Sequence, residues 1–246
     1  MRFVRVMAVV AAGALALAGC GGDEDGSGGS GGDAAQVNTF EGKTPEQVLE
    51  AAKKAAQGAK SVHMTGDLSE GSSSFEIDMV LSDGQGGQGS ITIDGDEMAL
   101  RQVGKDVYVK GSKDVWASMV PGSGEVAGKL DGKWVHVRSS DDASSRFTEI
   151  TTMDKAFESL LKPSGKQLEK VAGKDVDGTP TIGLLDKGDS EDDSATLYIA
   201  TRGPAYPLLV EPKSQSGKIA FTEWDADVKI EAPKGSTVEL SKILKT

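Results

Sequence analysis

The chain has 246 residues, and 38 acidic against 27 basic side chains give it a formal charge of −11. This negative charge excludes nucleic acid as the main partner, because phosphate binding requires a basic face. One cysteine excludes a disulfide framework and any cysteine-rich zinc module, and two histidines leave little room for a histidine metal site. The length fits one domain with appendages.

Residues 1–19 are predicted to be a secretory signal peptide. Arg2 and Arg5 precede an apolar run of 13 residues, which is shorter than the roughly 20 that a membrane-spanning helix needs. The run ends in Leu17-Ala18-Gly19-Cys20, which resembles the bacterial lipobox. The resemblance implies diacylglycerol transfer to the Cys20 thiol, cleavage before it, and anchoring by acyl chains such as palmitate at the extracytoplasmic face of the cell membrane. The alternative is an ordinary signal that is cleaved elsewhere.

Residues 20–43 predict a lipidated cysteine followed by a flexible tether. Gly, Ser and Asp dominate this stretch, whose root-mean-square reach is about 25–30 Å. A metal site at Asp23-Glu24-Asp25 is the less favoured interpretation of its acidic trio. Removal of residues 1–19 leaves 25 basic and 38 acidic residues, a charge of −13. Lipid rather than charge must therefore hold the protein at an anionic leaflet.

The folded domain, residues 44–246, is predicted to begin with a helix over 44–59. Thr44 is a suitable N-cap, Pro45 suits the first turn, and Gln47 completes a capping box. A second helix is predicted over 152–162, with a break at 139–150 before it. The apolar residues at helical spacing in these two segments are Val48, Leu49, Ala52, Ala55, Ala56 and Ala59, then Met153, Ala156, Phe157, Leu160 and Leu161.

After Ser61 the apolar period changes from 3.6 to 2, which predicts strands with one apolar and one polar face. Asp94-Gly95 predicts a hairpin turn between two of them. We expect about twelve strands and two or three helices. The predicted strands lie around 62–68, 75–81, 91–93, 98–100, 107–109, Trp116, 134–137, 168–171, 181–185, 195–201, 208–212, 218–224 and 227–230. Strands in such number exclude a parallel α/β fold.

Two motifs could suggest ligand sites. Gly84, Gly86 and Gly89 match G-x-G-x-x-G, but a strand follows where a dinucleotide site needs a helix, so the motif predicts a hairpin loop. Residues 186–193 carry five acids without the order of a calcium loop, and they predict a solvated hairpin tip.

The sequence predicts no catalytic residue, no metal and no cofactor. His63 and His136 fall on the polar phase of their strands, and no hydrolase or zinc-protease motif is present. A Ser-His-Asp site assembled from distant residues stays open. Four aromatic side chains could stack on a ligand, although packing is the commoner role. They are Tyr108, Trp116, Trp134 and Trp224.

The layout over residues 44–240 resembles the LppX/LprG-type bacterial lipoproteins, which share the LolA/LolB-like fold. The order and spacing of several segments carry this resemblance. Besides Cys20, they are the helix 44–59 running into KSVHMTG at 60–66, DVYVKG at 106–111 with Trp116, KWV at 133–135, DVDGTPT at 175–181, YPL at 206–208, FTEWD at 221–225, and Ala232-Pro233.

The resemblance implies an α+β fold in which a strongly curved antiparallel sheet forms a half-barrel and helices cover its concave side. It also implies an apolar cavity that binds lipid or glycolipid acyl chains, which the protein carries or presents at the cell envelope. Flexible methionines suit such a cavity, and burial contributes about 0.8 kcal/mol for each CH₂ group. The candidate cavity residues are Val62, Met64, Phe75, Ile77, Met79, Leu81, Ile91, Ile93, Met98, Leu100, Val107, Val109, Leu197 and Ile199.

The implied partners are the membrane, through the lipid anchor, a lipid or glycolipid ligand, and an envelope transporter or another lipoprotein. The alternative function is a non-enzymatic envelope sensor or assembly protein of the same fold, with its interior filled by side chains. A third hypothesis, a hydrolase, would need a nucleophile beside His63 or His136.

Overall fold

The computed structural model describes residues 40–119, 124–139, 144–165, 167–190 and 193–243. The predicted signal peptide, Cys20 and most of the tether lie outside the described residues. In the described part of the chain, no helix is long and apolar enough to cross a bilayer.

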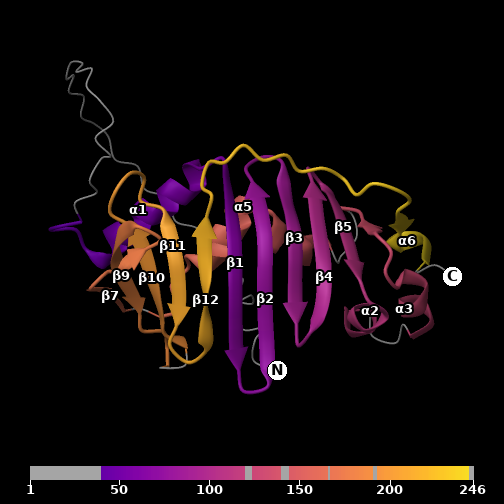
Figure 1. Ribbon diagram of the computed structural model, residues 1–246, viewed down its shortest axis with the longest axis horizontal. Coiled ribbons are helices and arrows are strands. Elements are labelled where there is room, and N and C mark those ends of the chain that lie inside the picture. Colours follow the sequence, from indigo (N-terminus) through magenta and orange to yellow (C-terminus); the bar gives the residue numbers. More distant parts are fainter. Residues whose placement is uncertain (1–39, 120–123, 140–143, 166, 191–192, 244–246) are drawn as a thin grey trace, which may run out of the picture.

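The described residues form one open, curved sheet of thirteen strands (Figure 1). The strand order is β13-β6-β5-β4-β3-β2-β1-β12-β11-β10-β9-β7, with β8 paired to β9, and every pair except β13–β6 is antiparallel. The strands are β1 (Ser61–Glu70), β2 (Ser73–Ser82), β3 (Gly86–Ile93), β4 (Asp96–Val103), β5 (Asp106–Gly111), β6 (Val135–Val137), β7 (Leu168–Val171), β8 (Asp175–Val176), β9 (Thr179–Asp186), β10 (Ala195–Ala200), β11 (Pro207–Pro212), β12 (Ser216–Thr222) and β13 (Val238–Glu239).

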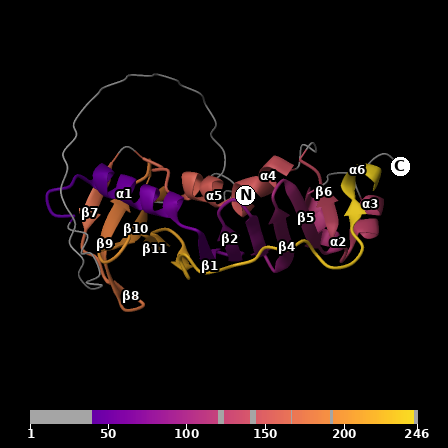
Figure 2. The ribbon, with the colours of Figure 1, turned by 90° about the horizontal axis from the view of Figure 1, so that it is seen from above.

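Helices cover one face of this sheet. Figure 2 shows α1, α5 and α4 in a row over the strands. Helix α1 packs against α5 and the strands β7 and β9, whereas α4 packs against β3, β4 and β5. The helices are α1 (Pro45–Gly58), α2 (Lys113–Met119), α3 (Gly124–Leu130), α4 (Ser144–Thr151), α5 (Met153–Leu160) and α6 (Leu240–Ile243). The predicted α+β class and helix-covered, curved sheet are confirmed.

The helix cap and the hairpin turns were predicted well, because each depends on a short local sequence. Thr44 caps α1 and forms the capping box with Gln47. Asp94 and Gly95 both have positive φ, as the type I′ turn of a two-residue hairpin requires. Gly84 of the glycine motif lies in the β2–β3 turn, whereas Gly86 and Gly89 lie in β3. The helix cap, the Asp94-Gly95 turn and the hairpin at the glycine motif are confirmed, and the predicted tip at 186–193 lies partly outside the described residues, at 191–192.

Trp116 was wrongly assigned to a strand, because it lies in α2. Val115 and Trp116 are the buried residues of that helix, and Ser112 Oγ accepts a hydrogen bond from the Val115 N–H at 3.2 Å, as an N-cap does. A helix of seven residues has too few turns to show a clear helical period of apolar residues. The β propensity of Trp therefore led to the prediction of a strand.

Three further predictions were wrong. Part of the predicted break at 139–150 forms α4, and the described residues hold six helices rather than two or three. The predicted strand 227–230 is irregular backbone. Its D-V-K-I alternation fits a strand, but none of the strands in the described residues pairs with it. A side chain satisfies one of its carbonyls instead, since Gln85 donates to Val228 O, and Arg101 donates to O of the following residue, Glu231.

Candidate functional site

The candidate cavity residues share the helix-covered face of the sheet. Direct cross-strand partners point to the same side, and the register joins Met64 to Met79 and Leu100 to Val109. Between these two pairs, Gly89 of β3 faces both Met79 and Leu100. The sequence alternation therefore predicted correctly which residues share this face.

Eleven of these candidates are buried in the core. Six of them are wholly inaccessible: Met79, Leu81, Leu100, Val107, Val109 and Ile199. The other five are Val62, Met64, Ile77, Ile91 and Leu197. Their packing partners include Phe221 of β12 and the α5 side chains Met153 and Phe157.

The remaining three candidates lie where the apolar face meets solvent. Phe75 and Met98 are half-buried, and Ile93 is 52% exposed, the one exposed large hydrophobic residue in the described part of the chain. Phe75 pairs directly with both Leu68 and Ile93, and Met98 pairs with Ile91. We call the surface formed by Leu68, Phe75, Ile93 and Met98 the open end.

Helix α4 lies at the other end of the same strands. A Cβ on Gly87 would meet the backbone of Thr151 at 2.7 Å, and Thr151 Oγ1 is hydrogen-bonded to Gln102 Oε1. Gln102 is buried and also donates to Gly104 O at 2.8 Å. The helical cover is thus fastened to one end of β3 and β4, and the apolar face continues beyond it to the open end.

Gln102 was missed by sequence reasoning, although a signal was present. It follows Met98 and Leu100 on the inward phase of β4, where an amide must find a partner. Its partner Thr151 lies between the predicted break at 139–150 and the predicted helix 152–162, so the pair could not be assembled from the sequence.

Aromatic side chains close the interior beside α5. Phe157 lies 5.4 Å from Phe221 and 5.3 Å from Trp224, ring centroid to ring centroid, and Tyr206 stacks on Trp224 at 4.3 Å. The indole N–H groups of Trp116 and Trp224 are buried without a hydrogen-bond partner among the described residues. Trp116 and Trp224 thus pack within the protein, as the commoner role predicts, and Tyr206 packs on Trp224.

Two hollows lie away from the candidate residues' common face. The first, about 260 Å³, is on the opposite face of the sheet, with Asp67, Glu76, Asp78 and Lys218 among its lining residues. The second, about 520 Å³, runs along the outer side of α1 and is lined mainly by charged side chains such as Lys43, Glu46 and Lys54. Ile77 is the one candidate cavity residue among the lining residues of these two hollows.

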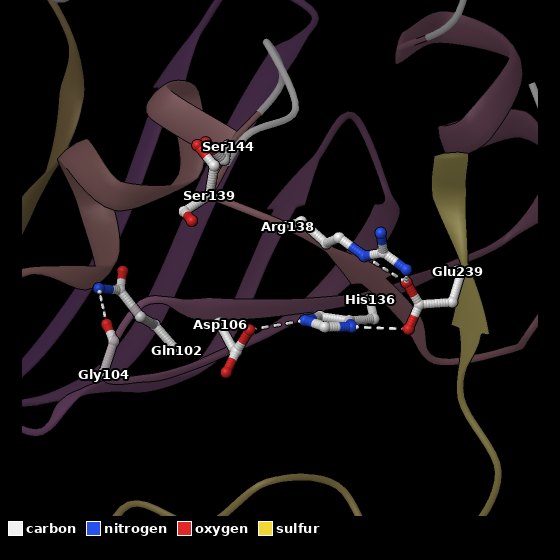
Figure 3. A network of polar contacts seen from close by, with 8 residues as sticks. All are labelled: Gln102, Gly104, Asp106, His136, Arg138, Ser139, Ser144 and Glu239. Atoms are coloured by element: carbon white, nitrogen blue, oxygen red, sulfur yellow. Dashed lines mark hydrogen bonds and ion pairs between the residues drawn. The ribbon is translucent and has the colours of Figure 1, made fainter. Parts of the chain in front are cut away.

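Both histidines make contacts with carboxylates. His63 Nε2 lies 2.8 Å from Asp78 Oδ1, and its Nδ1 lies 3.9 Å from Glu223 Oε2. His136 lies between Asp106 and Glu239 (Figure 3). A hydrolytic triad instead requires a hydroxyl or thiol hydrogen-bonded to the imidazole. Among the described residues, no three His, Cys, Asp or Glu side chains form a group that could hold a metal ion.

No family model matches the sequence, and no curated protein matches it. Among solved structures, the chain is similar to LprF from Mycobacterium bovis, with a TM-score of 0.50, 16% identity, and coverage of 81% of this chain and 100% of LprF. It is also similar to the Mycobacterium tuberculosis lipoprotein LppX, with a TM-score of 0.45, 16% identity, and coverage of 76% of this chain and 100% of LppX. At the level of fold, the resemblance seen in the sequence is confirmed, because the chain has the fold of LprF.

Proposed function

We propose that the chain is a non-enzymatic lipoprotein, anchored through Cys20 at the extracytoplasmic face of the cell membrane, that binds the acyl chains of lipids or glycolipids on the concave face of its sheet. The observation that supports this most is the open end. There the apolar face of β1–β4 continues past its helical cover, and Ile93 is 52% exposed.

The chemistry of the open end favours acyl chains over a compact polar ligand. Leu68, Phe75, Ile93 and Met98 offer apolar contacts, and burial of hydrocarbon contributes about 0.8 kcal/mol for each CH₂ group. Methionine side chains adapt to ligands of different shape. The residues at the adjoining β3–β4 turn, Asp94, Asp96 and Glu97, are acidic and exposed, so they do not favour an anionic head group.

A single substitution at the open end tests the proposal. Ile93→Asn removes apolar area that is already exposed, so the fold should be retained while affinity for a fluorescent long-chain fatty acid falls roughly fivefold. Thr92→Asn is the matched control, because Thr92 directly precedes Ile93 in β3 and faces the opposite side of the sheet. Fluorescence titration of both purified variants measures the effect.

The proposal would be wrong if both variants bound the fatty acid as the unmodified protein does, or if that protein bound none. Mass spectrometry of protein purified from its native host in mild detergent gives an independent check. Near-stoichiometric acylated molecules are the expected result.

The buried candidates favour a second function. Side chains such as Met79, Leu100 and Val109 are inaccessible, as expected for an interior filled by the protein itself. The chain would then be an envelope sensor or assembly protein that docks to a transporter or another lipoprotein. Protein from the native host that is free of acylated molecules, with no fatty-acid binding in solution, would support this function over lipid binding.

A further inference from the structure

His136 of β6 lies between two carboxylates from separate parts of the chain (Figure 3). Its Nε2 is 2.8 Å from Asp106 Oδ1 in β5, and its Nδ1 is 2.9 Å from Glu239 Oε1 in β13. A neutral imidazole has one N–H donor, whereas an imidazolium has two, and carboxylates only accept. Both contacts can therefore be hydrogen bonds at the same time only when His136 is protonated.

We propose that His136 is a pH-dependent latch that holds the C-terminal segment, residues 238–243, on the edge of the sheet and loosens it when the imidazolium loses its proton. This inference is independent of the proposed lipid binding.

The segment is also held by a short strand pairing and by the packing of α6 against β6. β13 has two residues and pairs with β6 only through Val238 with Val135 and Glu239 with His136. The Val238 N–H also donates to Trp134 O at 2.9 Å, and Leu240 of α6 is buried. Of the two hydrogen bonds of His136, the one to Glu239 attaches the segment, and the one to Asp106 fixes the ring to β5, so the bond to Glu239 is the contact that a change of protonation weakens.

The latch lies at the C-terminal end of a long irregular connection between β12 and β13. Residues 223–237 contain no helix or strand and run along one end of the sheet from β12 to β13 (Figure 1). Asp225 binds the Lys60 N–H at the near end, and Arg101 donates to Glu231 O further along. A change at the latch would thus loosen residues 238–243 while the start of the connection stays attached.

Burial and the neighbouring carboxylates have opposite effects on the pKa of His136. Burial favours the neutral form, but hydrogen bonds and charge from Glu239 and Asp106 outweigh it and raise the pKa of His136. Tyr108 of β5 stacks on the ring at 4.9 Å, Arg138 donates to Glu239 Oε2 at 2.7 Å, and α6 carries Lys242 in its last turn. The hydrogen bond from His136 is the main cause of the lowered pKa of Glu239.

The direction of the pH effect follows from the raised pKa. The latch contributes fully below the ordinary histidine pKa of 6.5, and its contribution is lost as pH rises through the higher pKa of the folded protein. The Arg138–Glu239 ion pair does not depend on the His136 proton, so we expect the segment to loosen rather than to detach completely.

Hydrogen exchange tests the latch. Peptides covering residues 236–243 are followed by mass spectrometry from about pH 5.5 to 9, with correction for intrinsic exchange, while NMR follows both imidazoles. Protection should fall roughly three- to tenfold as His136 titrates, a range that allows for solvent around the exposed Asp106. Glu239→Gln should lower the pKa of His136.

The two histidines of the chain provide matched variants. His136→Gln should show low, pH-independent protection of residues 236–243, whereas His63→Gln should keep the pH dependence of the unmodified protein. A His136 pKa at or below 6.5, or pH-independent protection in the unmodified protein, overturns the proposal. Both readouts come from the unmodified chain, so they decide the matter even if His136→Gln does not fold.

Discussion

Asp225 shows how one side chain stabilises an irregular turn. Its Oδ1 accepts the Lys60 N–H at 2.7 Å, and its Oδ2 accepts the Tyr206 hydroxyl at 2.5 Å. Asp225 itself has φ of +60°, which Asp and Asn adopt at lower cost than most residues. The hydrogen bond from Tyr206 is the main cause of the lowered pKa of Asp225, whereas burial and this contact raise the pKa of Tyr206 to about 12.

Replacing this carboxylate should destabilise the fold in a pH-dependent way. Asp225→Asn keeps the backbone preference but weakens the contact with Tyr206, and we expect a loss of about 1 kcal/mol at pH 7, allowing for solvent exposure. Because the pKa of Asp225 is lowered in the folded state, its contribution is present above the ordinary value of 3.8 and is lost as pH falls through the folded pKa. Urea unfolding at neutral and acid pH measures both effects. Asp227→Asn, an exposed site two residues on, should change stability little, and equal losses in the two variants would contradict this role.

Asp225 and His136 also show what the sequence could not reveal about single residues. Each acts through partners far away in the chain: Asp225 binds Lys60, and His136 binds Glu239. The polar phase of β6 was predicted correctly, but no local pattern indicates which carboxylates will face the ring. The face of the sheet on which a side chain lies follows from alternation along its own strand. The residues that contact it from other strands depend on the order of the strands in the sheet.

Within the β2–β3 hairpin, the glycines have unequal roles. A Cβ on Gly89, whose φ is +154°, would lie 1.9 Å from Asp78 O of the neighbouring strand. Gly84 has φ of +68° in the turn, and a Cβ there would meet nothing within 4 Å. The glycine motif therefore combines one position of close backbone approach with one position that needs only a left-handed conformation.

This difference gives a stability prediction for the hairpin. Gly89→Ala should cost about 3 kcal/mol or more, because β2 and β3 must move apart to admit the methyl group. Gly84→Ala should cost about 1 kcal/mol, the price of a left-handed backbone for alanine. Thermal or urea unfolding of both variants measures the difference. Similar losses would show that close approach at Gly89 does not constrain the pairing.

The sequence predicted the strands better than the helices for a physical reason. In β1–β5 one face is buried and the other meets solvent, so alternation runs through whole strands such as Phe75–Leu81. The helices α2 and α4 have seven and eight residues, which is about two turns, whereas the equally short α5 was predicted because its apolar residues recur at Met153, Ala156, Phe157 and Leu160. Alternation also gave the wrong prediction of a strand at 227–230, because a strand requires a neighbouring strand to pair with, and a pattern of period 2 does not show whether one is present.

At the scale of the whole molecule, the net negative charge of the chain would act against the proposed lipid anchor at an anionic membrane. The chain carries 38 acidic and 27 basic residues, and the predicted cleavage before Cys20 would remove two of the basic ones. Such a surface is repelled by anionic lipids, so the folded domain alone should not stay on the membrane. A lipid anchor at Cys20 would instead hold the domain near membrane lipids that the open end could bind.

Cell fractionation separates the anchor from the open end. Cys20→Ser should move the protein from the membrane to the soluble extracytoplasmic fraction, because no acyl chain would be attached. The unmodified protein should resist a wash at about 1 M salt, where the Debye length is roughly 3 Å and ionic contacts are screened. Ile93→Asn serves as the control, since it should stay on the membrane even though its fatty-acid binding is weaker. If Cys20→Ser also stayed on the membrane through that wash, the domain itself would supply the attachment, and apolar contact at the open end would be the first cause to test with the double variant.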